Sequence, residues 1–382
     1  MIRTWPVLAV VFVLGLAAAA PALGAFPGEN GKIAFDSDRR DGDDRRGVDE
    51  DIWTMDPDGG NLVNLTAESK MADLAPNWRA DGQRIAFMSD RVTATNPEAD
   101  FEIFVMKADG SHQTQITFNA LDDEEPAWSP DGRRIAFVRD LDPIRGQTDD
   151  DLLTMNADGS EQRNLTSSPG VGDSSPNWSP DGTRIAFLSD RDGDLEVYTM
   201  RPNGSSVRQL TFNDGFEFQP NWSPDGRQIT FTSDRTDSAE VFVMDADGSN
   251  LRRVSTGNGK TTCGYFYDRD RRIFFSSTHG ADTACPPRPD FSRGYVWRLD
   301  PFDIYTATTD GSDLRRLTKW NAYTAEGTLS PDGSRIVFTS TKDGDLEIYT
   351  INSGGGGKQP VTDNSSDDYY PSYSPSGKKI AY

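Results

Sequence analysis

The most chemically suggestive stretch of this chain is an acidic turn near its middle. Four carboxylates stand there at alternate positions: Asp190, Asp192, Asp194 and Glu196. Oxygen donors at alternate positions of a glycine-containing turn are typical of Ca²⁺ loops. A shorter version of the pattern, Asp343-Gly-Asp345-x-Glu347, recurs later in the chain. The four residues are therefore a candidate calcium site, and no other cofactor is expected.

The acidic turn belongs to a wider pattern, in which a carboxylate precedes each of several apolar runs. These acids are Asp51, Glu102, Asp151, Glu196, Glu240, Asp303 and Glu347. In one interpretation each pairs with the arginine of an S-D-R sequence and stabilises a turn; the arginines are Arg39, Arg91, Arg191 and Arg235. Such exposed pairs contribute about 0–1 kcal/mol each. In the other interpretation, the ring of acids holds cations.

The acids recur because the chain is a repeat. Each copy carries an anchor, usually aromatic, seven positions before the isoleucine of an R-I-A-F run: Phe26, Trp78, Trp128, Trp178, Trp222, Phe266, Leu329 and Tyr373. The anchors are spaced 44 to 63 residues apart, and repeats of roughly 40–45 residues are typical of four-stranded propeller blades.

One copy, residues 176–211, shows the elements that position the acids. Pro180-Asp181-Gly182 is a turn between two short strands, because proline presets φ and Asp and Gly tolerate a tight reversal. The run from Arg184 to Leu188 is apolar on both faces, which indicates a strand covered by neighbouring blades. A third strand from Glu196 and a fourth after Asn203-Gly204 complete an antiparallel, all-β blade.

The repeated W-S-P-D-G-x-x-I-A-F, S-D-R, E-[IV]-Y-x-M and A-D-G-S sequences resemble the WD40-like β-propeller repeat of the TolB type. The resemblance covers residues 26–382 and implies a single propeller. The resemblance gives little information about function, since such repeats occur in the periplasmic Tol-system component, in exported proteins and as lids on serine peptidases. The Tol-system component also has an N-terminal α/β domain, whereas the repeats here start at Phe26, so its partners are not carried over.

We predict seven blades. Residues 370–382 supply an innermost strand that we expect to complete the first blade, closing the ring and removing its exposed edges. The alternative is eight blades in a longer protein, because Lys379-Ile-Ala-Tyr382 competes with Lys32-Ile-Ala-Phe35 for one second-strand position.

The sixth repeat contains an insertion, Ser277 through Phe302, that is rich in aromatic residues and arginines. This is the composition of a contact surface, and its candidate binding residues are Arg288, Arg293, Tyr295, Trp297 and Arg298. Alternatively, the loop folds over its own blade. Cys263 and Cys285 are the chain's two cysteines, and in an exported protein we expect them to form a disulfide.

Residues 1–25 have the pattern of a secretory signal peptide, with an apolar run too short to span a bilayer comfortably. No cysteine lies near the cleavage region, so we expect a periplasmic or secreted protein without a lipid anchor or a membrane span in the mature chain. An uncleaved anchor is the alternative. The net charge of −22 disfavours nucleic acid and anionic lipid, whereas a basic partner or divalent cations would be tolerated.

The chain lacks the motifs of several enzyme classes, namely G-x-S-x-G, H-E-x-x-H and a phosphate loop, and it has two histidines. The best interpretation is an exported, non-catalytic propeller that binds a protein or a cell-envelope polymer through its loop rim or central funnel. One alternative is a polysaccharide hydrolase or lyase that uses paired funnel carboxylates. The other is a calcium-stabilised scaffold.

Overall fold

The computed structural model describes most of the repeat region. The described residues are 30–31, 33–37, 50–56, 58, 60–141, 149–236, 238–267, 271–282, 284, 299–364, 367–368, 371–377 and 380–381. The predicted signal peptide therefore lies outside the described residues.

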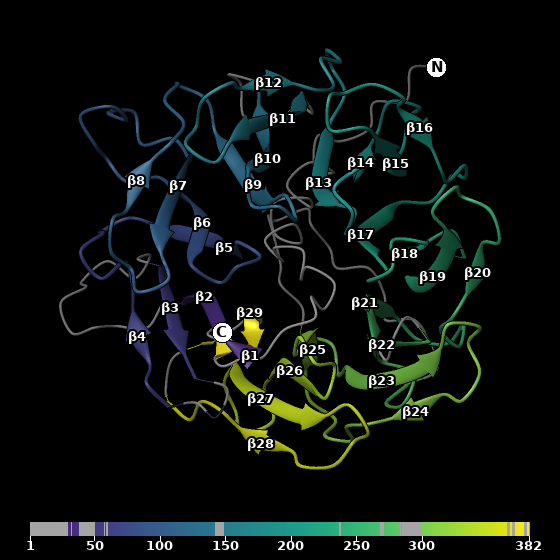
Figure 1. Ribbon diagram of the computed structural model, residues 1–382. Helices are drawn as coiled ribbons and strands as arrows, with labels where there is room; N and C mark the ends of the chain where they lie inside the picture. Colours follow the sequence, from purple (N-terminus) through teal and green to yellow (C-terminus); the bar gives the residue numbers. More distant parts are fainter. Residues whose placement is uncertain are drawn as a thin grey trace, which may run out of the picture.

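The described residues form six complete four-stranded antiparallel blades arranged in a ring (Figure 1). Three of them are β5 to β8 (Asp73–Trp78, Arg84–Ser89, Glu102–Lys107, Thr114–Gln115), β9 to β12 (Asp123–Trp128, Arg134–Asp140, Asp150–Asn156, Arg163–Asn164) and β13 to β16 (Asp173–Trp178, Ile185–Ser189, Glu196–Met200, Arg208–Gln209). The others are β17 to β20 (Glu217–Trp222, Gln228–Ser233, Glu240–Asp245, Arg252–Arg253), β21 to β24 (Thr261–Tyr267, Arg272–Ser277, Asp303–Thr308, Arg315–Arg316) and β25 to β28 (Thr324–Leu329, Arg335–Ser340, Glu347–Asn352, Gln359–Pro360).

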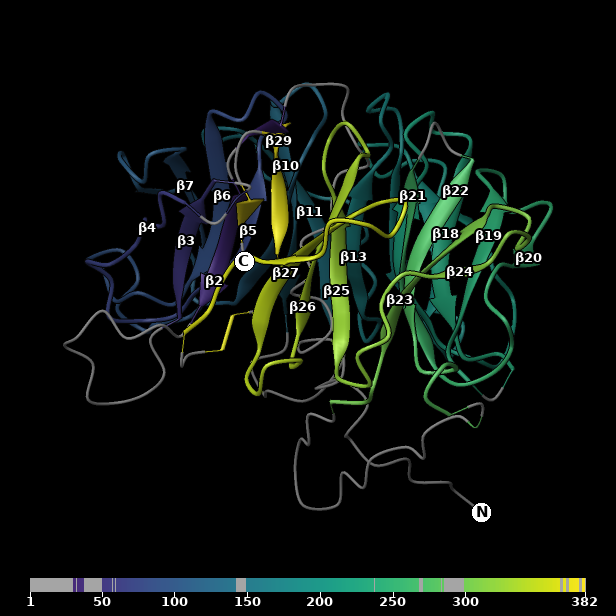
Figure 2. The same ribbon diagram turned by 90° about the horizontal axis from the view of Figure 1, so that it is seen from below.

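Each blade places its first strand nearest the centre of the ring and its short fourth strand at the outside (Figure 1). The strands run along the axis of the ring (Figure 2). Consequently, all second strands end, and all third strands begin, at the same edge of the ring. We call this the acidic edge, because the carboxylates that begin the third strands lie on it. The opposite edge carries the turns between first and second strands and between third and fourth strands, and we call it the turn edge.

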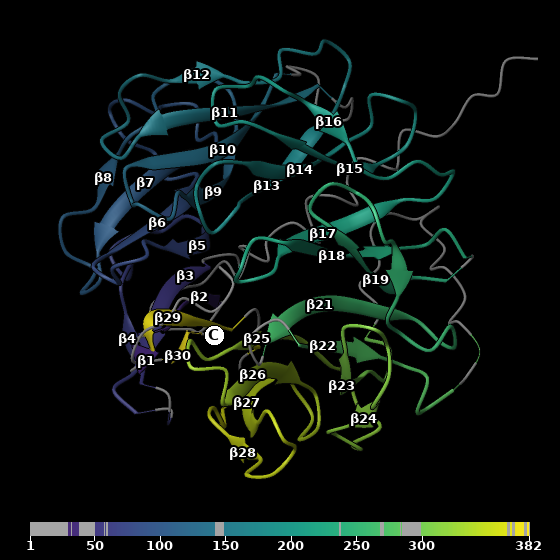
Figure 3. The same ribbon diagram turned by 45° about the vertical axis from the view of Figure 1, so that its right-hand side comes forward.

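The first and last described strands of the chain meet between β5 and β25 (Figures 1 and 3). They form two three-stranded sheets, one of β2 (Ile33–Ser37), β3 (Asp51–Met55) and β4 (Val63–Asn64), the other of β1 (Asn30–Gly31), β29 (Ser372–Gly377) and β30 (Ile380–Ala381). A hydrophobic cluster spans the junction, with Ile52 on β3, Trp78 on β5, Ile348 on β27 and Tyr373 on β29. The first and last described strands thus pack together through side chains.

The prediction of seven complete blades, with eight as the alternative, was wrong: six are present among the described residues. We expected the C-terminal strand to pair with the second strand of the first repeat, here β2. Instead, β29 pairs with β1 along one edge and β30 along the other. Tyr373 lies opposite Ile380, as Trp178 lies opposite Ile185. The chain's own last residues therefore occupy the edge that β2 would need.

The predicted burial of the second strands on both faces is confirmed. In β14, every residue from Ile185 to Ser189 is buried. Clusters between neighbouring blades provide this cover, as where Leu152 and Leu165 of one blade pack with Trp178 and Phe187 of the next. At about 25 cal/mol per Å² of buried apolar surface, these layers are the main stabilising term of the ring.

A repeated arginine clamp joins the strands of a blade at the acidic edge. Arg91 Nη2 lies 2.6 Å from Asp73 Oδ1, and its guanidinium stands 5.4 Å from the ring centroid of Phe87 and 4.7 Å from that of Phe104. The same arrangement recurs for Arg191 with Asp173 and for Arg235 with Glu217. The acid begins the first strand and the aromatic rings lie on the second and third, so one cation connects three strands.

The first strand of every complete blade contains a left-handed residue three positions before its anchor. These residues are Ala75, Glu125, Ser175, Gln219, Cys263 and Glu326, with φ between 51° and 57°. The pairing register of the first and second strands shifts at this point, for example between Ser174 and Asn177, as in a β-bulge. The bulge places the side chains of the first strand out of the usual alternation.

We predict that removing a clamp destabilises the fold strongly. Arg91→Ala leaves the fully buried carboxylate of Asp73 without its cation, so the free energy of unfolding should fall by about 2–4 kcal/mol. Chemical denaturation of the purified protein measures this. Arg227→Ala is the matched control, because that side chain is 85% exposed and 3.6 Å from its partner Asp225; its effect should stay within about 0.5 kcal/mol. Equal effects of the two substitutions would contradict the clamp.

Candidate functional site

The carboxylates that begin the third strands are buried and accept hydrogen bonds from hydroxyl or amide groups that follow the short fourth strand; Asp303 also pairs with Arg316. Thr66 Oγ1 donates to Asp51 Oδ1 at 2.8 Å, and Thr318 Oγ1 donates to Asp303 Oδ1 at 2.8 Å. The predicted pairing of these acids with the S-D-R arginines was wrong for Arg91, Arg191 and Arg235, because those guanidinium groups bind the acids of the first strands. Arg39 lies outside the described residues.

The two edges of the ring differ in the pKa values of their carboxyls. On the acidic edge, burial raises the pKa of many carboxyls. These are Asp73, Asp90, Asp100, Glu102, Glu124, Glu125, Asp150, Asp173, Asp194, Glu196, Glu217, Glu240 and Glu347. On the turn edge, hydrogen bonds from neighbouring hydroxyls lower the pKa of the exposed Asp109, Asp158, Asp247 and Asp310. Ionisation is therefore disfavoured at these acidic-edge carboxyls and favoured at the turn-edge aspartates. Asp343 is an exception on the acidic edge, because hydrogen bonds with Tyr349 and Lys342 lower its pKa.

The largest of these effects lie on β9 and at the start of β11. Burial raises the pKa of Glu125 to about 8 and the pKa of Glu124 well above its ordinary value, and repulsion by Glu125 and Asp122 adds to the latter. Burial, with repulsion by Asp140, raises the pKa of Asp150 to about 7. Glu125 is the left-handed residue of this strand, and its Oε2 accepts a 2.8 Å hydrogen bond from the Ser175 amide of the next blade.

Glu124 and Glu125 were not singled out from the sequence. A signal was present, since the first strand reads D-E-E-P-A-W here but D-L-A-P-N-W and D-S-S-P-N-W in two other copies. Only this copy has acids at both positions before the proline. The difference was concealed by the many acids elsewhere in the repeat.

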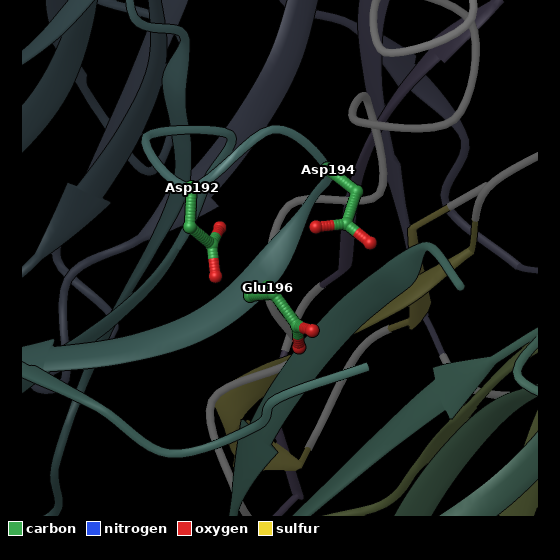
Figure 4. A group of neighbouring side chains, drawn as sticks. All are labelled: Asp192, Asp194 and Glu196. Carbon is green, nitrogen blue, oxygen red and sulfur yellow. The ribbon is translucent and has the colours of Figure 1, made fainter. Parts of the chain in front are cut away.

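Three of the four predicted calcium ligands lie together in the structure. Asp192 and Asp194 stand on the turn before β15, and Glu196 is the first residue of that strand (Figure 4). One carboxylate oxygen from each lies within 4.8 Å of the others. Asp190 is not part of this group; its Oδ1 accepts a 2.8 Å hydrogen bond from the Gly172 amide. Three of the four alternately spaced carboxylates thus lie close together, and their role as calcium ligands stays a prediction.

The related turn at residues 343–347 is arranged differently. Lys342 Nζ lies 3.0 Å from Asp343 Oδ1, and the Tyr349 hydroxyl donates to Asp343 Oδ2. Within the part of the chain that the structure describes, this turn forms no comparable carboxylate group. Equal spacing in the sequence thus leads to two different local environments.

The predicted contact surface of the sixth repeat lies outside the described residues, and this includes Arg288, Arg293, Tyr295, Trp297 and Arg298. Cys285 lies outside them as well, while Cys263 is a buried thiol on β21. The disulfide therefore stays a prediction. The insertion leaves β22 at Ser277 and returns to β23 at Asp303, so both of its ends are at the acidic edge.

Six antiparallel four-stranded blades in a ring define the chain as a β-propeller. The model of the TolB beta propeller domain family matches residues 174–285 and 276–382, more than half of the chain. The chain belongs to the TolB β-propeller domain family, as its repeated motifs predicted.

Similar proteins share this fold but differ in their names. The chain is 30% identical to a protein TolB homolog of Chlorobium chlorochromatii, in a match covering 21% of this chain and 28% of that protein. The TolB structure from Acinetobacter baumannii has a TM-score of 0.52 at 16% identity, covering 85% of this chain and 79% of that one. An oligogalacturonate lyase in complex with manganese has a TM-score of 0.61 at 15% identity, covering 92% and 94%.

The matches to the first curated relatives span only 28% of those proteins' length. At the identities of the solved structures, the likeness shows the fold alone. As for membranes, the described residues contain no helix with the length and apolar character needed to cross a bilayer.

We predict that Glu125 makes stability fall as pH rises. Its pKa is about 8 in the fold against an ordinary 4.5, so between these pH values the folded state binds more protons than the unfolded state. The free energy of unfolding then decreases with pH, by at most about 1.4 kcal/mol per pH unit for this group. Thermal melts of the wild type and Glu125→Gln from pH 5 to 9 measure the contribution.

Glu125→Gln keeps an acceptor for the Ser175 amide and should flatten the pH dependence and raise the melting temperature at pH 8.5. The exposed Glu68 provides the control, since Glu68→Gln makes the same change of charge and should leave the slope as in the wild type. A Glu125→Gln slope equal to that of the wild type would show that this carboxyl is not held protonated.

Proposed function

We propose that this protein is an exported, non-catalytic propeller that binds a positively charged partner, a protein or a cell-envelope polymer, on its acidic edge. The observation that carries the proposal is the segregation of raised-pKa carboxyls on that edge, with the largest shifts at Glu124, Glu125 and Asp150. Export rests on the predicted signal peptide at residues 1–25.

Electrostatics supports a cationic partner. Ionising a carboxyl with a raised pKa costs free energy, because burial and neighbouring acids oppose the charge. A nearby lysine or arginine of a partner offsets that cost, so binding lowers the pKa of these carboxyls and releases protons. The net charge of −22 also steers cations toward the protein and repels nucleic acid.

The scaffold supports a preformed surface. The arginine clamps hold the first-strand acids in place, and inter-blade hydrogen bonds such as the one from the Ser175 amide to Glu125 tie neighbouring strands together. Little conformational entropy is then lost on binding. The insertion at residues 277–302 leaves and rejoins this same edge, so we propose that Arg288, Arg293, Tyr295, Trp297 and Arg298 extend the contact surface.

A second candidate is a polysaccharide hydrolase or lyase. It is favoured by one observation, the neighbouring Glu124 and Glu125 with raised pKa. A carboxylic acid that stays protonated near pH 7 can act as a general acid, and the pKa of about 8 fits Glu125 for that role. The two functions differ in outcome, because an enzyme shortens a polymer that a binding protein leaves intact.

The test compares two triple variants with the same change of charge. The acidic-edge variant combines Glu124→Gln, Glu125→Gln and Asp150→Asn. The turn-edge variant combines Asp109→Asn, Asp158→Asn and Asp247→Asn. Calorimetric titration with an octalysine peptide at pH 8 and low salt should show about a tenfold loss of affinity for the first variant. The turn-edge variant should stay within about twofold of the wild type, whose affinity should rise from pH 6 to 8.5 as the carboxyls ionise.

Equal losses in both variants would contradict the proposal, because binding would then depend on net charge alone. Shortening of neutral or acidic polysaccharides by the wild type, abolished by Glu125→Gln, would replace it with the enzyme alternative. Chromatographic sizing of the polymer before and after incubation gives that readout.

A further inference from the structure

We propose that the turn before β15 binds one calcium ion through Asp192, Asp194 and Glu196. Their three carboxylate oxygens lie within 4.8 Å of one another. Oxygen ligands stand about 2.3–2.6 Å from Ca²⁺, so two ligands of one ion are at most about 5 Å apart. The three groups are therefore already within the range that a single ion requires.

A second and independent observation concerns the inner member of the group. The Glu196 side chain is 0% exposed, and its Oε2 has no hydrogen-bond partner. Its Oε1 accepts from the Asn213 amide at 2.5 Å and from Asn213 Nδ2 at 3.0 Å. A buried carboxylate oxygen without a donor is costly, and a cation would satisfy it.

The rest of the turn leaves room for an ion and its water. Asp192 is exposed and Asp194 half-buried, so solvent reaches the outer side of the group. Gly193 has φ of 119°, a conformation that favours glycine, and a Cβ added there would meet nothing within 4 Å. Gln209 Nε2 donates to Asp192 Oδ2 and orients that carboxylate. Three carboxylates with water completing the shell suit the flexible coordination of Ca²⁺ better than the strict octahedron of Mg²⁺.

Among the described residues, no lysine or arginine forms an ion pair with this group, although Arg191 is adjacent in sequence. Arg191 Nη2 lies 2.9 Å from Asp173 Oδ1, the acid that begins β13. At the related turn, the position of Arg191 is taken by Lys342, and the strand that corresponds to β13 begins with Thr324. Without a first-strand acid, Lys342 pairs with Asp343 instead. The first-strand residue thus decides which acidic turn stays available for a metal.

The experiment titrates CaCl₂ and MgCl₂ separately into chelator-treated protein, by calorimetry and by thermal melts. With calcium at about a hundredfold excess over the Kd, the melting temperature should rise by about 2–4 °C. Asp192→Asn with Asp194→Asn should weaken calcium binding at least tenfold and remove the rise. Asp343→Asn with Asp345→Asn is the matched control and should bind as the wild type does.

Glu196→Gln gives a separate readout that does not depend on the exposed acids. It removes the buried charge, so the melting temperature without calcium should rise while the calcium response is lost. Absence of any calcium binding by the wild type would overturn the proposal, as would equal binding of magnesium or loss of binding in the control variant alone. Circular dichroism of each variant without metal verifies the fold.

Discussion

Four of the six complete blades among the described residues depend at the acidic edge on a buried ion pair held against aromatic rings. An arginine at the end of the second strand, such as Arg91 or Arg235, meets a fully buried acid of the first strand and stands over rings of the second and third. Each clamp lies at the acidic edge, where the chain must leave one strand and enter the next. The pair stabilises the blade only as a unit, since either charge alone would be buried without compensation.

This device accounts for the uneven electrostatics of the molecule. The clamps neutralise acids of the first strands, but each blade also buries an acid at the start of its third strand. Asp303 is paired with Arg316. The four glutamates of the set, Glu102, Glu196, Glu240 and Glu347, are bonded to hydroxyl and amide groups instead, as Glu102 is to the Asn119 amide, and burial raises their pKa. The turn-edge aspartates face solvent and their own turn hydroxyls, so their charge costs little. An acidic chain thus acquires one edge on which positive charge is favoured.

The two acidic turns show how a single distant residue alters local chemistry. Both carry aspartates at the same spacing, followed by a glutamate. Asp173 engages Arg191 at the first turn, whereas Thr324 leaves Lys342 to neutralise the second. Whether such a turn is a candidate metal site or is paired internally therefore depends on the first residue of the first strand in the same blade.

Sequence alone determined the all-β class, the four-stranded blade, its turns and the TolB family, because each depends on residues a few positions apart: the Pro-Asp-Gly turns, the alternation of strands, the period. It also singled out the three carboxylates that lie together on the turn before β15. The tertiary structure decided the number of complete blades, since β30 takes the edge of β29 that β2 would need. It likewise decided the partner of each arginine and the raised pKa of Glu125. Those outcomes depend on strand competition and burial, which arise only when distant segments meet.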